Sequence, residues 1–104
     1  AANAVERGVI VAWNNYEAAT AAIAARQQQI AASDVALEGV REESQLGTRT
    51  NLDVLDAEQD LLDARVNLVQ AERDQWVAAY ALLSSIGQLT GSRLGIKAAE
   101  VDTP

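Results

Sequence analysis

The sequence predicts an all-α fold, a long antiparallel helical hairpin of coiled-coil type, and three observations support this prediction. The only proline is Pro104, so no interior residue forces a helix to break. Alanine supplies much of the 49% apolar share, while phenylalanine and methionine are absent, which favours close helix contacts over a thick core. Apolar residues recur every seven positions on both sides of one glycine-containing turn. We therefore expect helices at about residues 3–46 and 50–89, within a single domain.

The first predicted helix carries one apolar seam. Its members recur at seven-residue spacing with a second residue filling each intermediate step, which is the pattern of a coiled coil. They are Val5, Val9, Ala12, Tyr16, Ala19, Ile23, Ile30, Leu37 and Val40. A strip of small residues on another side would let a neighbouring backbone approach closely. This strip consists of Val11, Ala18, Ala25, Ala32 and Gly39.

The turn is expected at residues 47–50. Gly47 suits the left-handed conformation that ends many helices. Thr50 can cap the next helix, and Asp53 lies three residues later, in the acidic place of a capping box and near the positive helix end. The hairpin domain should span residues 1–90. We expect Thr90, Gly91 and Ser92 to stop the second helix and residues 91–104 to form an irregular or frayed tail.

Two apolar seams follow the second helix. The first seam is expected to face the first helix, with Tyr16 near Tyr80 and Ile30 near Val66. It consists of Leu52, Leu55, Leu62, Val66, Val69, Trp76, Tyr80 and Leu83. The second seam has large residues lined by alanines. It consists of Val54, Leu61, Leu68 and Leu82, with Ala57, Ala64, Ala71 and Ala78.

One partner helix cannot cover both seams of the second helix. Leaving the four large residues of the second seam in water would forgo about 6 to 12 kcal/mol of burial free energy. That amount rivals the whole stability of a small domain, about 5 to 15 kcal/mol. We therefore predict that the chain associates with another helix layer through the second seam.

An acidic strip separates the two seams of the second helix. Aspartates at three- and four-residue spacing repel one another slightly, and an ordinary solvated face would explain such a strip equally well. Its members are Asp53, Asp56, Asp60, Asp63, Asn67, Gln70 and Asp74.

The composition of the chain argues against several classes of function. Neither cysteine nor histidine occurs, so we expect no catalytic residue, no metal site and no cofactor. The formal charge of −7 argues against nucleic acid as a partner, because such binding relies on basic residues. No apolar run is long enough for a membrane-spanning helix, and no leader pattern occurs. Because the heptad pattern is already under way near Ala1, we expect a fragment of a longer precursor.

Residues 46–57 read LGTRTNLDVLDA and continue through Glu58 and Gln59 to Ala64. This stretch resembles the second helical hairpin of the TolC family of outer-membrane efflux channels, and the run G-T-R-T-x-x-D-V-L-D carries the resemblance. A looser similarity extends over nearly the whole chain, including YALLSSIGQLT at residues 80–90.

The resemblance implies a homotrimeric, passive conduit of tripartite efflux or type I secretion systems in Gram-negative bacteria. A β-barrel in the outer membrane would continue into a helical barrel across the periplasm, and each protomer would supply two hairpins. This chain would be the C-terminal periplasmic hairpin, and the membrane-spanning strands would lie outside it. Its turn would form the tip, where a periplasmic adaptor and an inner-membrane pump engage the channel.

The resemblance also implies roles for residues near the turn. Arg49 falls on the gate arginine of the family and, with Gly47, Thr48 and Thr50, would form the gate at the tip. The acidic positions that ring the entrance are matched by Asp53 and Asp56. The chain departs from the family at Ser44, where family members can carry a gate tyrosine.

Two other functions compete with a conduit. A periplasmic adaptor also contains a coiled-coil hairpin, although it lacks this turn motif and is embedded between lipoyl-like β segments. An enzyme could use carboxylate pairs, such as Asp53 with Asp56 or Asp60 with Asp63. Ferritin-like metal sites, however, draw on glutamate and histidine from several helices, and this chain has no histidine.

Overall fold

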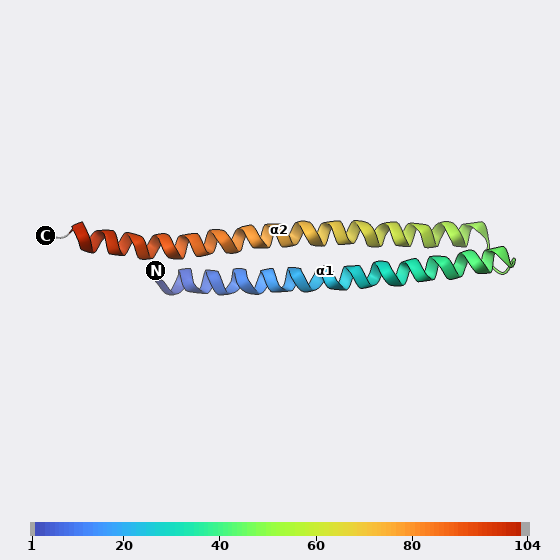
Figure 1. Ribbon diagram of the computed structural model, residues 1–104, viewed down its shortest axis with the longest axis horizontal. Coiled ribbons are helices and arrows are strands. Elements are labelled where there is room, and N and C mark those ends of the chain that lie inside the picture. The colour runs from blue at the N-terminus through green and yellow to red at the C-terminus, as the bar shows by residue number, and fades with distance from the viewer. Residues whose placement is uncertain (1, 103–104) are drawn as a thin grey trace. The chain divides into compact units, whose positions relative to one another are not determined.

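The computed structural model describes the backbone of residues 2–102 and, within it, the side chains of residues 3–91, 93 and 94. Two α-helices account for nearly all of this range: α1, Ala2–Gln45, and α2, Asn51–Asp102 (Figure 1). Residues 46–50 connect them. The predicted all-α helical hairpin is therefore confirmed, and both helix ends at the turn lie within one residue of their predicted positions.

The far end of α2 differs from the prediction. The helix continues through Thr90, Gly91 and Ser92 to Asp102, so the expected irregular tail is wrong for residues 91–102. Each of the two glycines in this extension, Gly91 and Gly95, costs a helix only about 1 kcal/mol relative to alanine, and most of the other residues are good helix formers. The first proline comes at Pro104, and residues 103–104 of the expected tail lie outside the described residues.

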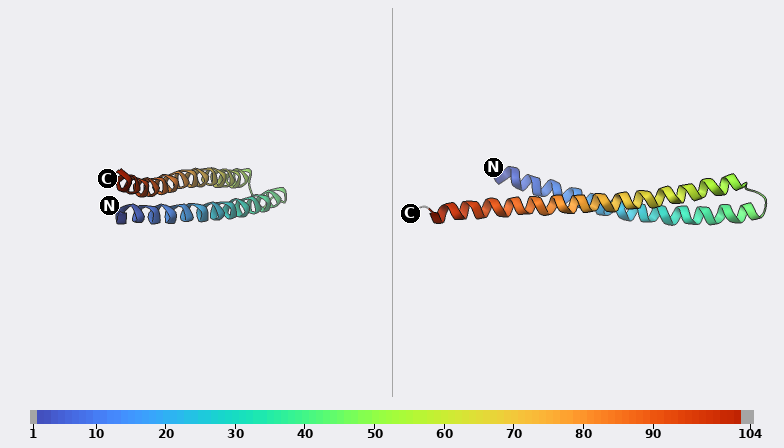
Figure 2. Two further views of the ribbon diagram at one scale, coloured as in Figure 1. Left: turned by 60° about the vertical axis from the view of Figure 1, so that its left-hand side comes forward. Right: turned by 90° about the horizontal axis from the view of Figure 1, so that it is seen from above.

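The chain divides into two compact units, residues 20–73 and residues 1–19 with 74–104. In the unit of residues 20–73, the two helical segments run in opposite directions away from the turn (Figures 1 and 2). The other unit contains both tryptophans and both tyrosines of the sequence.

The core of residues 20–73 is a thin seam between the two helical segments. Leu37 of α1 is buried together with Leu61, Ala64 and Ala71 of α2, and Ala64 is 0% exposed. A side chain on a lone helix cannot be fully covered, so the α1 segment must pack over Ala64. The predicted seam of α1 is confirmed, because its other members in this unit are partly buried. They are Ile23, Ile30 and Val40.

Segments of α1 and α2 also pair within the unit of residues 1–19 and 74–104. Ala12 of α1 and Leu82 of α2 are its buried apolar residues among the described side chains. Tyr16 lines a shallow groove with Trp76 and Ala79, and its ring lies 6.2 Å from that of Trp13. These neighbours match the register that a turn at residues 47–50 imposes.

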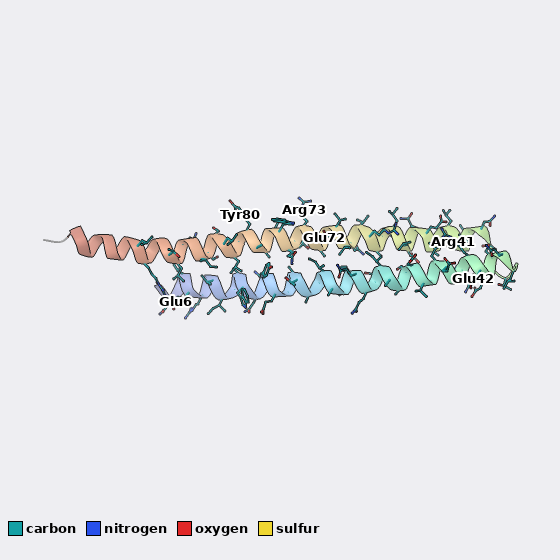
Figure 3. The ribbon with its side chains drawn as sticks, in the orientation of Figure 1. Glu6, Arg41, Glu42, Glu72, Arg73 and Tyr80 are labelled. Carbon is teal, nitrogen blue, oxygen red and sulfur yellow. The ribbon has the colours of Figure 1, made fainter. Side chains whose placement is uncertain are left out.

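The face of α2 that packs against α1 is not the predicted one. Residues of the second seam are buried or partly buried, whereas those of the first seam are exposed, with Trp76 at 77% and Tyr80 at 78%. Figure 3 shows Tyr80 on the side of α2 away from α1. The second seam alternates large residues with alanines. Because alanine is small, α1 can approach α2 closely enough to cover the large residues of this seam. The prediction that the second seam is free for another helix layer is therefore wrong at Leu61 and Leu82.

Candidate functional site at the turn

The C-terminus of α1 ends in a Schellman motif. Gly47 has a φ of +81°, and its N–H donates to the carbonyl of Ser44 at 3.1 Å. The N–H of Thr48 donates to the carbonyl of Glu43 at 2.9 Å, and the Thr48 hydroxyl donates to the same oxygen at 2.9 Å. The positive φ favours glycine, so the cap predicted at Gly47 is confirmed.

The N-terminus of α2 begins with a reciprocal capping box. The backbone N–H of Asp53 donates to the hydroxyl of Thr50 at 3.2 Å, and the N–H of Thr50 donates to the Asp53 carboxylate at 3.0 Å. Hydrogen bonding to the backbone of Thr50 is the largest cause that lowers the pKa of Asp53 below its usual value, and hydrogen bonding to the Thr50 side chain is the second. The predicted capping roles of both residues are therefore confirmed, and the Asp53 carboxylate is charged at neutral pH.

Arg49 makes an ion pair that the sequence analysis missed. Its Nε–H donates to the carboxylate of Glu43 at 2.6 Å, and both side chains are about half exposed. The hydrogen bond and then the charge of Glu43 raise the pKa of Arg49, so the guanidinium stays charged. The pair is six residues apart, beyond the three- or four-residue spacing of neighbours on one helix. Its only signal in the sequence is an acid and an arginine on either side of the turn glycine.

A second ion pair joins the two helices close to the turn. Arg41 of α1, labelled in Figure 3, lies 3.3 Å from the carboxylate of Glu58 on α2, and both side chains are exposed. The sequence analysis missed this pair as well, although the residues lie at matching distances from the turn. Such an exposed pair stabilises the hairpin by less than about 1 kcal/mol but favours one register.

The acidic strip lies beside the capped turn. Asp56 is exposed and Asp53 is partly exposed, so both predicted entrance carboxylates can meet solvent. Asp60 and Asp63 are also exposed, and the Gln59 amide donates to the Asp63 carboxylate at 3.0 Å. Among the described residues, no group of three acidic, histidine or cysteine side chains is placed to hold a metal ion. The described helices also include none long and apolar enough to cross a membrane.

Comparison with known proteins identifies the family. The family model described as outer membrane efflux protein matches residues 3–88. The chain is 47% identical over 96 residues to the outer membrane efflux protein BepC of Brucella suis biovar 1 (strain 1330), covering 92% of this chain and 21% of that protein. It is 38% identical over 77 residues to the outer membrane protein TolC of Vibrio cholerae serotype O1 (strain ATCC 39315 / El Tor Inaba N16961), covering 74% of this chain and 18% of that protein.

The chain thus spans about one fifth of the length of these relatives. No solved structure matches it significantly. The family match covers both helices up to residue 88 and the whole turn, including the motif that carries the TolC resemblance. The chain therefore belongs to the outer membrane efflux protein family.

Proposed function

We propose that this chain forms part of the periplasmic tunnel wall and of the entrance gate of a homotrimeric outer-membrane channel, serving efflux or type I secretion. The observation that carries the proposal is the exposed first seam of α2. This seam has the same seven-residue spacing as the covered one, yet α1 leaves it open to solvent. Family membership adds that both named relatives are outer membrane proteins.

A tunnel wall requires two packing faces on one helix. Each helix in a ring touches a neighbour on either side, and the remaining sides must be polar enough to face water. On α2 the second seam packs within the hairpin, the first seam lies on nearly the opposite side, and the acidic strip runs between them. A hairpin that packed only on itself would need one apolar seam. The strip of small residues on α1, exposed except at the partly buried Gly39, offers a further surface for a neighbouring helix.

The entrance gate would lie at the turn. Gly47 and Thr48 cap the C-terminus of α1, and Thr50 caps the N-terminus of α2. The charged side chain of Arg49, between the two caps, is half exposed. A guanidinium can make several directed hydrogen bonds to a neighbouring hairpin, which would hold the tip shut. Asp53 and Asp56 on the first turns of α2 would be repeated by symmetry around the mouth, where convergent carboxylates favour cations.

The tip would also receive the partners of the channel. A periplasmic adaptor and an inner-membrane pump would engage the turn, where Leu46 is 80% exposed. The channel itself would act as a passive conduit without chemistry on its cargo, and the pump would supply the energy. The family match favours this function over the coiled-coil hairpin of an adaptor.

The test of the gate is single-channel conductance in a planar bilayer, using a full-length channel that contains this hairpin. We expect Arg49→Ser to raise conductance, because serine cannot span the distance to a neighbouring hairpin. Arg65→Ser is a matched control, since Arg65 is an exposed arginine on α2 well beyond the turn. Conductance unchanged by Arg49→Ser, in a trimer that remains intact, would contradict the gate role.

A further inference from the structure

Glu43 accepts three hydrogen bonds from residues of the turn. Its carbonyl accepts both the N–H and the hydroxyl of Thr48, each at 2.9 Å. Its carboxylate accepts the Nε–H of Arg49 at 2.6 Å. The backbone bonds fix the position of Glu43 at the base of the turn, and the Schellman motif at Gly47 brings Arg49 back over the last turn of α1. Both partners of the ion pair are therefore held by local structure.

The geometry of this pair leaves most of the guanidinium available. Arginine has five N–H donors, and Glu43 takes the one on Nε. The hydrogen bonds recorded among the described side chains use neither terminal nitrogen of Arg49. The four remaining donors therefore stay available on a half-exposed arginine whose side chain is already anchored. A free arginine would lose rotamer entropy on binding, and anchoring reduces that loss.

We propose that Glu43 is a positioning residue for Arg49, holding the guanidinium so that its terminal nitrogens meet a neighbouring hairpin. This inference rests on the gate function proposed for Arg49 and adds a second residue to it. Glu43 lies on α1, before the turn, and would act on the gate only through Arg49. Removing its charge should therefore weaken the closed state without removing the gate contact itself.

The chain offers a matched control one residue away. Glu42 carries the same charge, and Figure 3 shows its side chain directed away from α2. Its backbone carbonyl accepts the N–H of Leu46 at 3.2 Å, so substitution of its side chain leaves this helical bond in place. Glu42→Gln and Glu43→Gln change the net charge equally and preserve side-chain size.

The experiment compares the single-channel conductance of full-length channels carrying Glu43→Gln, Glu42→Gln, Arg49→Ser, or Glu43→Gln combined with Arg49→Ser. We expect Glu43→Gln to raise conductance by part of the rise that Arg49→Ser causes, and Glu42→Gln to match wild type. In the combined variant, Glu43→Gln should add nothing, because the residue through which Glu43 acts has gone.

Each other outcome overturns a separate statement. Wild-type conductance in Glu43→Gln, while Arg49→Ser raises it, would refute the positioning role and leave the gate standing. Lower conductance in Glu43→Gln would also refute it, because Glu43 would then compete with the neighbouring hairpin for Arg49. An additive effect in the combined variant would show that Glu43 acts on the turn in general. If Arg49→Ser has no effect, the proposed gate itself is wrong.

Discussion

Asp53 and Asp56 lie three residues apart on the acidic strip, and the structure gives their carboxylates different surroundings. The carboxylate of Asp53 accepts the backbone N–H of Thr50 and closes the capping box. Asp56 lies one turn further along α2 and is exposed. A change at Asp53 would disturb both the cap and the charge of the proposed entrance, so Asp56 is the better residue for testing the charge alone.

Asp56→Asn should reduce the cation selectivity of the full-length channel and weaken its block by multivalent cations. The substitution keeps the side-chain size and removes one carboxylate per protomer from the proposed ring, which lowers the negative potential that attracts cations. Reversal potentials measured in low salt, where screening is weakest, provide the check. Asp60→Asn removes the same charge four residues further along α2, and we expect it to change selectivity less. Wild-type selectivity and block in Asp56→Asn would refute the acidic ring.

The contacts at the turn show which residue roles can be predicted from sequence. The capping roles of Gly47, Thr50 and Asp53 follow from residue type and a spacing of three, because a cap is satisfied by its own neighbours. The bond between Glu43 and Arg49 depends on the path that the chain takes through the turn. No helical spacing joins residues six apart, so only the folded turn reveals this pair.

At the scale of the helix, the two seams of α2 explain why one expectation was wrong. Both seams keep the seven-residue spacing, and periodicity shows which residues share a face but not which partner that face meets. The bulk of the first seam does not make it the partner of α1, because two helices approach more closely across alanine than across large side chains. The structure buries Ala64 completely beside Leu61, and it leaves the adjacent Leu62 more than half exposed.

Leu61 and Leu62 form a matched pair for testing this assignment. We expect Leu61→Ala to lower the free energy of unfolding of the hairpin by about 2 to 5 kcal/mol, as for other buried leucines. Leu62→Ala should lower it by less than about 1 kcal/mol, because the exposed side chain loses little burial. Chemical denaturation followed by circular dichroism, at low protein concentration, measures both values. Equal losses in the two variants would contradict the observed burial.

For the whole molecule, the exposed first seam predicts association. Large apolar side chains remain in solvent along α2 in each unit, and each would gain about 1.5 to 3 kcal/mol from complete burial. The carboxylates of the acidic strip flank this seam and repel their counterparts, which should restrict association to arrangements that keep the strips apart. The surface for another helix layer is therefore the first seam, in place of the second seam that the sequence analysis chose.

We expect the chain to self-associate at micromolar concentration in sedimentation velocity or light scattering. Combining Leu62→Gln with Val69→Gln should shift the chain toward the monomer, because both side chains lie on the exposed first seam. Asp60→Asn, an exposed change on the acidic strip that is not a three- or four-residue neighbour of Leu62 or Val69, should leave the chain associated. A stable, well-folded monomer of the unchanged chain under these conditions would rule out the predicted association.

The seven-residue spacing of both seams limits how the length of this chain can change. Each added residue turns a helix by about 100°, so one insertion in α2 would rotate every later seam residue toward the acidic strip or away from α1. Seven residues complete almost two turns and return the seams to nearly the same sides. Insertions or deletions of whole heptads, matched in α1 and α2, are therefore the length changes that preserve both packing faces.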